Sequence, residues 1–249
     1  MIYLKSSKEI EILRECNQIV VDVLTTLKRH CCPGITTLEL DRIAEDLTLK
    51  HKATSAFKGY NGFPATLCTS VNEEVVHGIP SRRVLEAGDI VSVDYGVLHR
   101  GFYGDAAFTI PVGKISKDIE FLLQTTRECL LLGIEKAVPG KHLSDVSAAI
   151  QEHAEGRGYS LVKEFSGHGV GRNLHEEPVV LNYVSSGRGV LLKPGLVIAI
   201  EPMVNQGTDQ VKVLADKWTV VTKDEKPSAH FEHSVAITES GPEILSIGL

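Results

Sequence analysis

Apolar positions near the start of the chain recur with the spacing of amphipathic helices. Over about residues 7–30 they follow an i, i+3, i+4, i+7 pattern, at Ile10, Leu13, Val20, Leu24 and Leu27. A second helical pattern follows Pro33-Gly34, a pair that is typical of a turn. Ser6 with Glu9, and Thr36 with Glu39, have the spacing of capping boxes. We therefore predict a long helix over about 7–30 and a second one that begins after Thr36.

The same order of elements is predicted again further along the chain. An amphipathic run over about 117–137 precedes Pro139-Gly140, and helical spacing resumes after this pair. Both halves then contain a His-x-x-Pro motif and an apolar run that ends in an acid; the motifs begin at His77 and His175, and the acids are Asp94 and Glu201. We interpret this pattern as an internal repeat, roughly 7–112 and 117–240, within one domain that spans 1–249.

Short β-rich runs lie close together in each half. They cover about 90–97, 102–112, 196–204 and 231–238, and the turns between them are too short for helical crossovers. This favours antiparallel pairing. We predict an α+β fold with pseudo-two-fold symmetry, in which helices cover one face of a curved antiparallel sheet.

Two acids occupy neighbouring strands of the first half. Asp94 ends an apolar run, Asp105 lies in the next run, and His99-Arg100 could form a two-residue turn between them. That turn would place Asp94 directly opposite Asp105, with Cβ atoms about 4.5–5.5 Å apart. Opposed like charges are unfavourable unless they are neutralised, although a solvated pair of acids is the ordinary interpretation of such a hairpin.

The repeat makes a metal site the better interpretation. Glu201 occupies the place that matches Asp94, and Glu232 the place that matches Asp105. Four carboxylates gathered in a mostly buried place call for a compensating dication. His168 adds an imidazole, and the glycines on either side of it allow a close backbone approach. Mixed carboxylate and imidazole ligands suit Mn, Fe, Co or Zn better than Ca.

Composition narrows the classes of function. Hydrophobic residues make up 43 % and charged residues 23 % of the 249 residues, an ordinary globular mixture. The net charge of −6 argues against DNA or RNA as the main partner. The five cysteines form no CxxC pair, which argues against a disulfide framework or a zinc knuckle. We expect no membrane span and no signal or transit peptide, and therefore a cytoplasmic protein.

Together these motifs resemble the type I methionine aminopeptidases. The stretch 165–183, with Gly167-His168-Gly169 and His175, is similar to the signature of that family. The remaining ligand motifs are matched by Asp94, Asp105, Glu201 in Ile-Glu-Pro-Met and Glu232 in Phe-Glu-His. The resemblance covers essentially the whole chain, without the long insertion of the type II enzymes and without an N-terminal extension. It implies the pita-bread fold, whose internal pseudo-two-fold agrees with the repeat.

The resemblance implies two divalent metal ions, Co, Mn, Fe or Zn. Asp94 would bind one ion through both oxygens, Asp105 and Glu232 would bridge the two ions, and His168 and Glu201 would complete the second site. Glu201 would also act as a base or proton shuttle for the attacking water. His175 would hydrogen-bond the substrate carbonyl oxygen, and His77 would contact the peptide beyond the scissile bond.

The resemblance also implies a substrate and its pocket. The enzyme would remove the initiator methionine from nascent chains, preferentially before a small second residue, as a monomer that transiently meets the ribosome. Aromatic and sulfur groups suit a thioether side chain. The matching pocket positions are Tyr60, Phe63, Cys68 and Trp218, although core packing is the ordinary role of any one aromatic residue.

Several positions depart from the family pattern. Gly96 stands where a hydroxyl residue is more usual, and Ala106 and Ala107 stand where Thr or Ser is expected. His230 replaces a common Gln, and Phe57 replaces a smaller pocket residue. Loss of hydroxyls around the ligands can weaken metal affinity by about 10–100-fold. The departures leave open whether this chain is a diverged second copy beside a housekeeping enzyme.

Other classes of protein share some of these features. A prolidase or aminopeptidase P would have the same five ligands, usually after a large N-terminal domain. A binding module on the same fold would typically have lost ligands. A Cys68/His77 hydrolase lacks an oxyanion glycine motif around Cys68.

Overall fold

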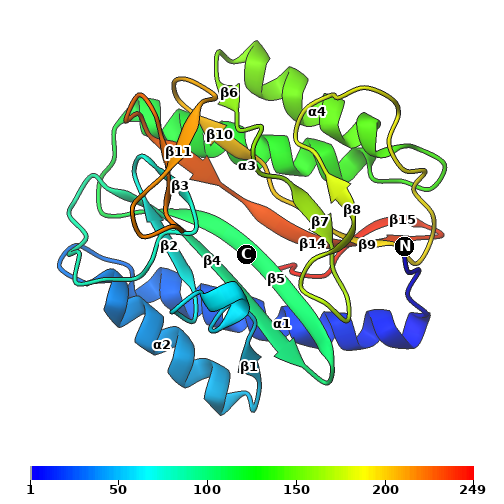
Figure 1. Cartoon of the computed structure of the whole chain (residues 1–249), viewed down its shortest axis with the longest axis horizontal. Helices are drawn as coiled ribbons and strands as arrows, with labels where there is room; N and C mark the ends of the chain where they lie inside the picture. Colours follow the sequence, from blue (N-terminus) through cyan, green and yellow to red (C-terminus); the bar gives the residue numbers. More distant parts are fainter. Residues whose placement is uncertain (1) are drawn as a thin grey trace.

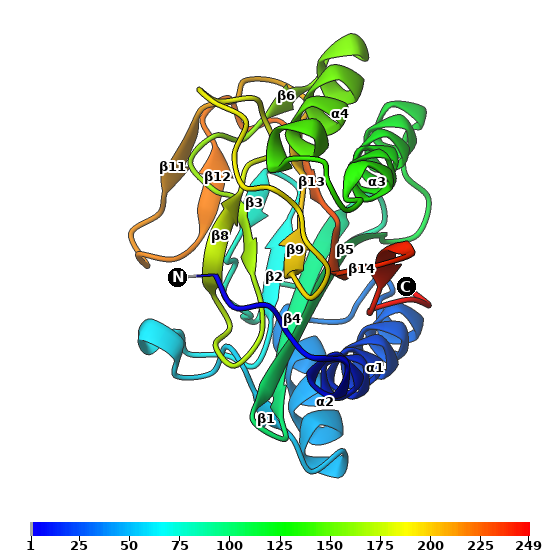
Figure 2. The same ribbon diagram turned by 90° about the vertical axis from the view of Figure 1, so that its right-hand side faces the viewer.

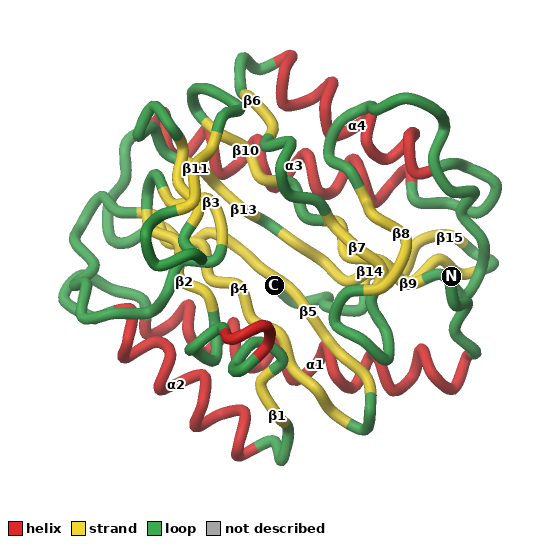
Figure 3. The backbone as a smooth tube through the Cα atoms, in the orientation of Figure 1, coloured by secondary structure: helices red, strands yellow, loops and turns green. Residues whose placement is uncertain are grey.

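Four long helices lie on one side of a strongly curved sheet. The computed structural model describes residues 2–249, and Figures 1 and 2 show the helices in two pairs against one face of the strands. The pairs are α1 (Ser7–His30) with α2 (Thr37–Lys50), and α3 (Lys117–Lys136) with α4 (Leu143–Gly156). Figure 3 shows the strands and loops that make up the other side of the molecule. This arrangement confirms the predicted α+β class with a curved antiparallel sheet.

The first two helices begin where their capping residues predict. The Ser6 side chain accepts from the backbone N–H of Glu9, whose carboxylate accepts from Ser6 in return. Thr36 and Glu39 form the same reciprocal pair at the start of α2. Each box satisfies backbone donors that the first turn of a helix leaves free.

Within residues 2–249, the large sheet has nine strands, all paired antiparallel. Along the sheet their order is β1-β4-β5-β14-β9-β7-β8, with β2 beside β4 and β15 beside β14. Their bounds are β1 Thr54–Ser55, β2 Cys68–Val71, β4 Ile90–His99, β5 Phe102–Pro111, β7 Gly167–Gly169, β8 Glu176–Val180, β9 Val197–Ile200, β14 Glu232–Thr238 and β15 Gly241–Ile244. Strands of both halves therefore belong to one sheet.

Two small sheets and one short helix complete the part of the chain that the structure describes. The first sheet contains β13 (Ser228–His230), β10 (Met203–Asn205) and β6 (Ser160–Leu161). The second contains β11 (Val211–Val213), β12 (Val220–Thr222) and β3 (Glu74–Val76). The 3-10 helix η1 spans Tyr60–Gly62.

The β4–β5 hairpin has a register different from the predicted one. Its turn residues are Arg100 and Gly101, with φ of 52° and 79°, the left-handed conformation that a tight hairpin turn requires. Asp94 therefore lies opposite Ala107, and Asp105 opposite Gly96. The prediction that the two acids face each other directly was wrong. Because the shift is two residues, both acids still point to the same face of the sheet.

The halves meet at the centre of the large sheet, where β14 pairs with β5 and places Glu232 opposite Ala107. Isolated bridges join Thr36 to Val84 and His142 to Leu191, at matching places before α2 and α4. These bridges agree with an internal repeat. The repeat bounds of roughly 7–112 and 117–240 stay a prediction.

Side chains along β4 point alternately to the hydrophobic core and to the opposite face of the sheet. Val91, Val93, Tyr95 and Val97 are buried against α1 and α2, so Asp94 and Gly96 point to the other face. A second apolar cluster lies between α3, α4 and the strands β9 and β14. Within residues 2–249, no helix is long and apolar enough to cross a membrane.

Candidate active site

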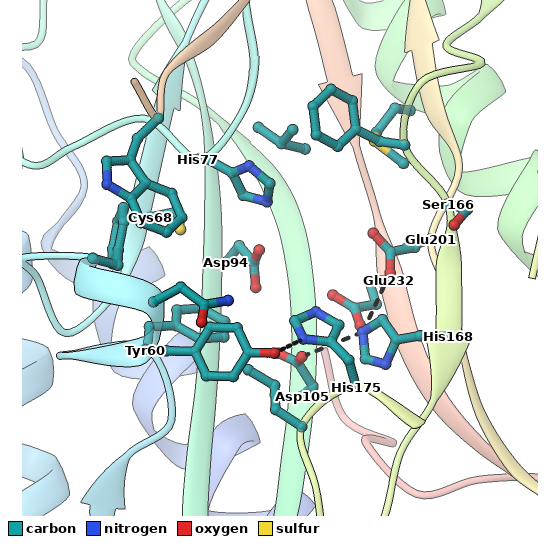
Figure 4. A pocket seen from close by; sticks show the side chains of 18 residues that line it. Tyr60, Cys68, His77, Asp94, Asp105, Ser166, His168, His175, Glu201 and Glu232 are labelled. Atoms are coloured by element: carbon teal, nitrogen blue, oxygen red, sulfur yellow. Dashed lines mark hydrogen bonds and ion pairs between the residues drawn. The ribbon is translucent and has the colours of Figure 1, made fainter. Parts of the chain in front are cut away.

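A pocket of about 300 Å³ opens on the face of the sheet away from the helices. All eleven candidate site residues line it, and Figure 4 shows the acids and histidines pointing into one space. These residues are Tyr60, Phe63, Cys68, His77, Asp94, Asp105, His168, His175, Glu201, Glu232 and Trp218. Residues that are far apart in the sequence are thus neighbours in one cavity.

Strand pairing places three of the acids in a row across the sheet. Asp94 on β4 and Glu232 on β14 both lie opposite Ala107 on β5, and Glu201 follows directly after β9, the next strand along. Directly paired residues point to the same face. The methyl group of Ala107 therefore lies between two carboxylates, where a larger side chain would fill the space that they share. Asp105 points to this face two residues earlier on β5.

His168 reaches the acids from β7. The strand runs between β9 and β8 so closely that a Cβ at Gly167 would lie 2.3 Å from the Ala199 carbonyl oxygen, and one at Gly169 would lie 2.4 Å from the Glu177 carbonyl oxygen. The flanking glycines thus permit a close approach to the neighbouring strands. Nε2 of His168 lies 3.5 Å from Glu201 Oε1 and 3.8 Å from Asp105 Oδ2.

The hydrogen bonding of His168 suits a metal ligand. Its Nδ1 lies 2.9 Å from the carbonyl oxygen of Gly169, an acceptor that requires the ring hydrogen on Nδ1. Nε2 then presents its lone pair to the acids. A metal-ligating histidine ordinarily donates its other N–H to such a carbonyl.

The acids are buried, and no Lys or Arg side chain within residues 2–249 forms an ion pair with them. Asp94 Oδ1, Asp105 Oδ1 and Glu232 Oε1 accept no hydrogen bond from any group in residues 2–249. Burial raises the pKa of Asp94 to about 7 and that of Glu201 to about 8, and raises the pKa values of Asp105 and Glu232 well above their usual range. Burying unpaired carboxylates is costly.

The donor set fits a divalent metal. One ligand atom from each of Asp105, His168 and Glu232 lies within 4.8 Å of the other two. Glu201 approaches the same imidazole, and Asp94 lines the same pocket. A divalent cation among these groups would supply the missing positive charge.

His230 also lies at this site. From the sequence it was named only as a departure from the family pattern. Its Nε2 lies 3.6 Å from Glu201 Oε2, and its backbone N–H and C=O both bond the Thr109 hydroxyl at 2.9 Å. Its side chain is buried. The nearby Glu232 motif was the only signal in the sequence that could have indicated it.

Aromatic residues from loops and from the β11–β12 hairpin line the pocket. Phe63 packs edge-on against Trp218 with ring centroids 5.1 Å apart. His77, with an unusual φ of 60°, lies between Phe165 and Trp218, at 5.4 and 6.3 Å. The Tyr60 hydroxyl lies 2.7 Å from His175 Nδ1. The sequence reasoning missed further lining residues, among them Phe165, Leu174 and Met203.

The structure accounts for two of the departures. A Cβ at Gly96 would lie 2.8 Å from Cε1 of Phe57 and 3.2 Å from Asp105 Oδ1, so the glycine makes room for the larger pocket residue. Ala106 lies opposite Tyr95, on the helix-facing side of the sheet, and is fully buried there. A hydroxyl at Ala106 would point away from the acids.

Comparison with known proteins agrees with this geometry. The profile of metallopeptidase family M24 matches residues 11–239. Methionine aminopeptidase 1 of Bacillus subtilis is 52 % identical over 246 residues, and the methionine aminopeptidase of Clostridium acetobutylicum is 50 % identical over 248; each alignment covers 99 % of both chains. The crystal structure of methionine aminopeptidase from Thermotoga maritima gives a TM-score of 0.97 at 44 % identity, again over 99 % of both chains.

A more distant structure shares the fold alone. Prolidase from Pyrococcus furiosus gives a TM-score of 0.81 at 24 % identity, and the match covers 99 % of this chain and 66 % of the prolidase. The higher identity and full-length coverage are found with the aminopeptidases. The chain therefore belongs to metallopeptidase family M24, among its methionine aminopeptidases.

Proposed function

We propose that this protein is a metal-dependent methionyl aminopeptidase that removes the initiator methionine from nascent proteins and peptides, preferentially when the second residue is small. One observation carries the proposal: buried acids and an imidazole, lacking a compensating charge within residues 2–249, lie beside an aromatic pocket. Full-length relatives at about half identity bear the name of this activity.

Two divalent ions, Co, Mn, Fe or Zn, are the proposed cofactors. Asp105 and Glu232 lie at the centre of the site, which suits them to bridge two ions, with Asp94 on one side. His168 and Glu201 lie together on the other side. Bound divalent ions supply Lewis-acid polarisation of the carbonyl and lower the pKa of an attacking water.

The remaining polar residues bind the substrate and move protons. Glu201 is the proposed base or proton shuttle, because it lies at the edge of the acid group beside His230. Burial lowers the pKa of His77 to about 4 and also lowers that of His175, so both rings are neutral at neutral pH and each can donate one N–H. His175 would donate to the substrate carbonyl oxygen, and His77 would contact the peptide beyond the scissile bond.

The methionine side chain would occupy the aromatic end of the cavity. Tyr60, Phe63, Cys68 and Trp218 line that end, and Cys68 pairs with Asp94 across β2 and β4, which brings the apolar pocket directly beside the acids. Polarizable sulfur and aromatic groups suit a thioether. A substrate whose first residue fills this pocket has its scissile carbonyl at the metal ligands.

The wider setting of the activity is also a proposal. We expect a cytoplasmic monomer whose substrates are the N-termini of nascent chains, with transient contact to the ribosome. Prolidase activity is the competing proposal, because the fold is shared. The full-length identity to methionine aminopeptidases favours the first activity.

A peptide panel with controlled metal content tests the function. Protein stripped by a chelator is reloaded with Co, Mn, Fe(II) or Zn, and free methionine is measured from Met-Ala, Met-Gly, Met-Leu and Met-Lys peptides, with Ala-Pro as the prolidase control. We expect metal-dependent release that is fastest from Met-Ala and Met-Gly. Release without metal, no release with any metal, or faster cleavage of Ala-Pro would contradict the proposal.

A further inference from the structure

The imidazole of His175 lies between two aromatic partners. On one side the Tyr60 hydroxyl is 2.7 Å from Nδ1, with the two ring centroids 5.3 Å apart. On the other side the ring of His168 is 4.3 Å away, centroid to centroid. Figure 4 shows His175 in this position, between Tyr60 and the metal-ligand candidates.

The direction of the Tyr60–His175 hydrogen bond decides which ring nitrogen carries hydrogen. A neutral imidazole has one donor nitrogen and one acceptor nitrogen. The Tyr60 hydroxyl makes no other hydrogen bond to residues 2–249, so its hydrogen is free to be donated. A phenol is the stronger donor of this pair and the imidazole nitrogen the stronger acceptor. Nδ1 therefore accepts, and the ring hydrogen resides on Nε2.

The loop that carries Tyr60 is a firm platform for this bond. The backbone N–H of Tyr60 bonds the Phe57 carbonyl at 2.9 Å, and the Tyr60 carbonyl accepts from Phe63 at the same distance. Gly59 donates to the Phe63 carbonyl at 2.8 Å and closes the loop. The backbone of Tyr60 is thus held in place, whereas its side chain is partly exposed and is oriented by the bond to His175.

The backbone next to His175 is anchored as well. Glu176 follows it in the chain and forms a buried ion pair with Lys5 at 2.7 Å. The other oxygen of Glu176 accepts from the Asn173 backbone at 3.1 Å. These contacts hold the chain next to His175, and the Tyr60 hydroxyl is the hydrogen-bond partner of its ring.

We propose that Tyr60 is a positioning residue for His175: its hydroxyl donates to Nδ1 and thereby keeps the ring hydrogen on Nε2, the nitrogen available to the substrate carbonyl oxygen. This role is distinct from lining the methionine pocket, which requires only the ring of Tyr60. The part that concerns the substrate rests on the proposed aminopeptidase activity; the tautomer does not.

Nitrogen-15 NMR of histidine-labelled protein tests the tautomer without any turnover. Spectra are recorded of the metal-stripped protein and of the Zn-loaded protein, and His175→Gln identifies the signals of His175 by their loss. We expect the hydrogen on Nε2 in the parent protein and a mixture of tautomers in Tyr60→Phe. Tyr183→Phe, which removes a hydroxyl that bonds the Lys163 carbonyl at 3.5 Å, is the matched control and should leave the His175 signals unchanged.

Steady-state kinetics test whether positioning of His175 by Tyr60 affects turnover. Tyr60→Phe should lower kcat on a Met-Ala peptide by about 10-fold, as loss of an orienting partner typically does, with KM changed less than about 2-fold because the ring stays in the pocket. Tyr183→Phe should behave as the parent protein.

The two readouts separate this inference from the proposed function. A hydrogen on Nδ1 in the parent protein, an unchanged tautomer in Tyr60→Phe, or a changed tautomer with unchanged kcat would each overturn the inference. A parent protein that releases no methionine but has the expected tautomer would overturn the function and leave the positioning by Tyr60 standing.

Discussion

The two halves of the chain supply acids to the same pocket by different routes. In the first half Asp94 and Asp105 lie on one hairpin, β4–β5, joined by a two-residue turn. In the second half Glu201 and Glu232 are separated by residues 202–231, which form strands of both small sheets. That intervening segment carries Trp218 and His230, for which the first hairpin has no counterpart.

This difference separates the gathering of the charged groups from the lining of the pocket. Neighbouring strands of the large sheet bring the charged groups together from both halves alike. The segment present in the second half alone adds Trp218, between β11 and β12, to a pocket that the first half also lines with Phe63 and Cys68. In the proposed function, the symmetric part of the fold would therefore supply the metal ligands, and the asymmetric part would add Trp218 to the substrate pocket.

The largest expected effect comes from neutralising one acid of either half. Asp94→Asn and Glu232→Gln each remove a charge from the proposed metal site, and both should lower methionine release by at least about 100-fold, since even an indirect partner of a ligand is worth about 10–100-fold. Metal content by mass spectrometry should fall in both. Glu239→Gln, in the exposed turn after β14, is the control. Full activity in either acid variant would refute a shared metal site.

The next effect concerns stability without metal. The raised pKa values of about 7 for Asp94 and about 8 for Glu201 mean that the folded protein keeps protons which the unfolded chain has released. Their contribution is full below the unfolded pKa values near 4 and is lost as pH rises through the folded values. Each carboxyl that stays protonated only in the folded state lowers the free energy of unfolding by about 1.4 kcal/mol for each unit that the pH rises.

The informative window for this measurement is pH 6.5 to 8. Histidines with depressed pKa values, such as His77 and His168 at about 4, also make the free energy of unfolding depend on pH. Their contribution increases with pH only up to about 6.5, the usual pKa of histidine, and is constant above it. Denaturant unfolding of chelator-treated protein should show stability falling across this window. With Mn or Co bound the decrease should be much smaller, because cations replace the protons. A metal-free protein whose stability is flat or rises over this range would contradict the charge arrangement.

Local sequence signals predicted the positions of helices better than the register of the β4–β5 hairpin or the short strands near the pocket. Helical spacing and the capping boxes located α1 and the start of α2 to within a residue, because each box depends on side chains three positions apart. The hairpin register was wrong because it depends on which two residues adopt positive φ, and Gly101 takes one of those places. Three-residue strands such as β10 and β12 are too short for a detectable period.

Some residues of the site could likewise be predicted from the sequence, and others could not. The acids could be predicted because the repeat sets them at matching places in the two halves, although Asp94 lies inside β4 and does not end its strand as the sequence had predicted. Phe165 and Leu174 could not, because an aromatic or aliphatic residue in a loop is ordinarily a core residue. Their place in the pocket depends on how the segments before and after β7 pack in the folded protein, which no local pattern encodes.

A smaller effect should follow from changes in the asymmetric segment. Trp218→Ala removes the ring that packs on Phe63 and should lower kcat/KM for Met-Ala by about 10-fold, at the low end for loss of apolar pocket contacts. The metal content should not change, in contrast to the acid variants. Val213→Ala, an exposed position on the same hairpin, is the matched control and should behave as the parent protein. Loss of metal in Trp218→Ala would contradict the separation of metal binding from the lining of the pocket.

The smallest effect tests how the first hairpin adapts to its pocket. Gly96→Ala would place a methyl group 2.8 Å from the Phe57 ring and 3.0 Å from Cβ of Ala56, too close without a shift of either. Overpacking of this kind costs about 1–3 kcal/mol of unfolding free energy. Phe57→Leu added to Gly96→Ala should recover part of the loss, because the smaller side chain vacates the contact. Gly156→Ala, where no atom lies within 4 Å of the new Cβ, should cost nothing comparable. If the double variant were as unstable as the sum of its single changes, glycine would be needed at position 96 for a reason other than the phenylalanine, and the two departures from the family pattern would be independent.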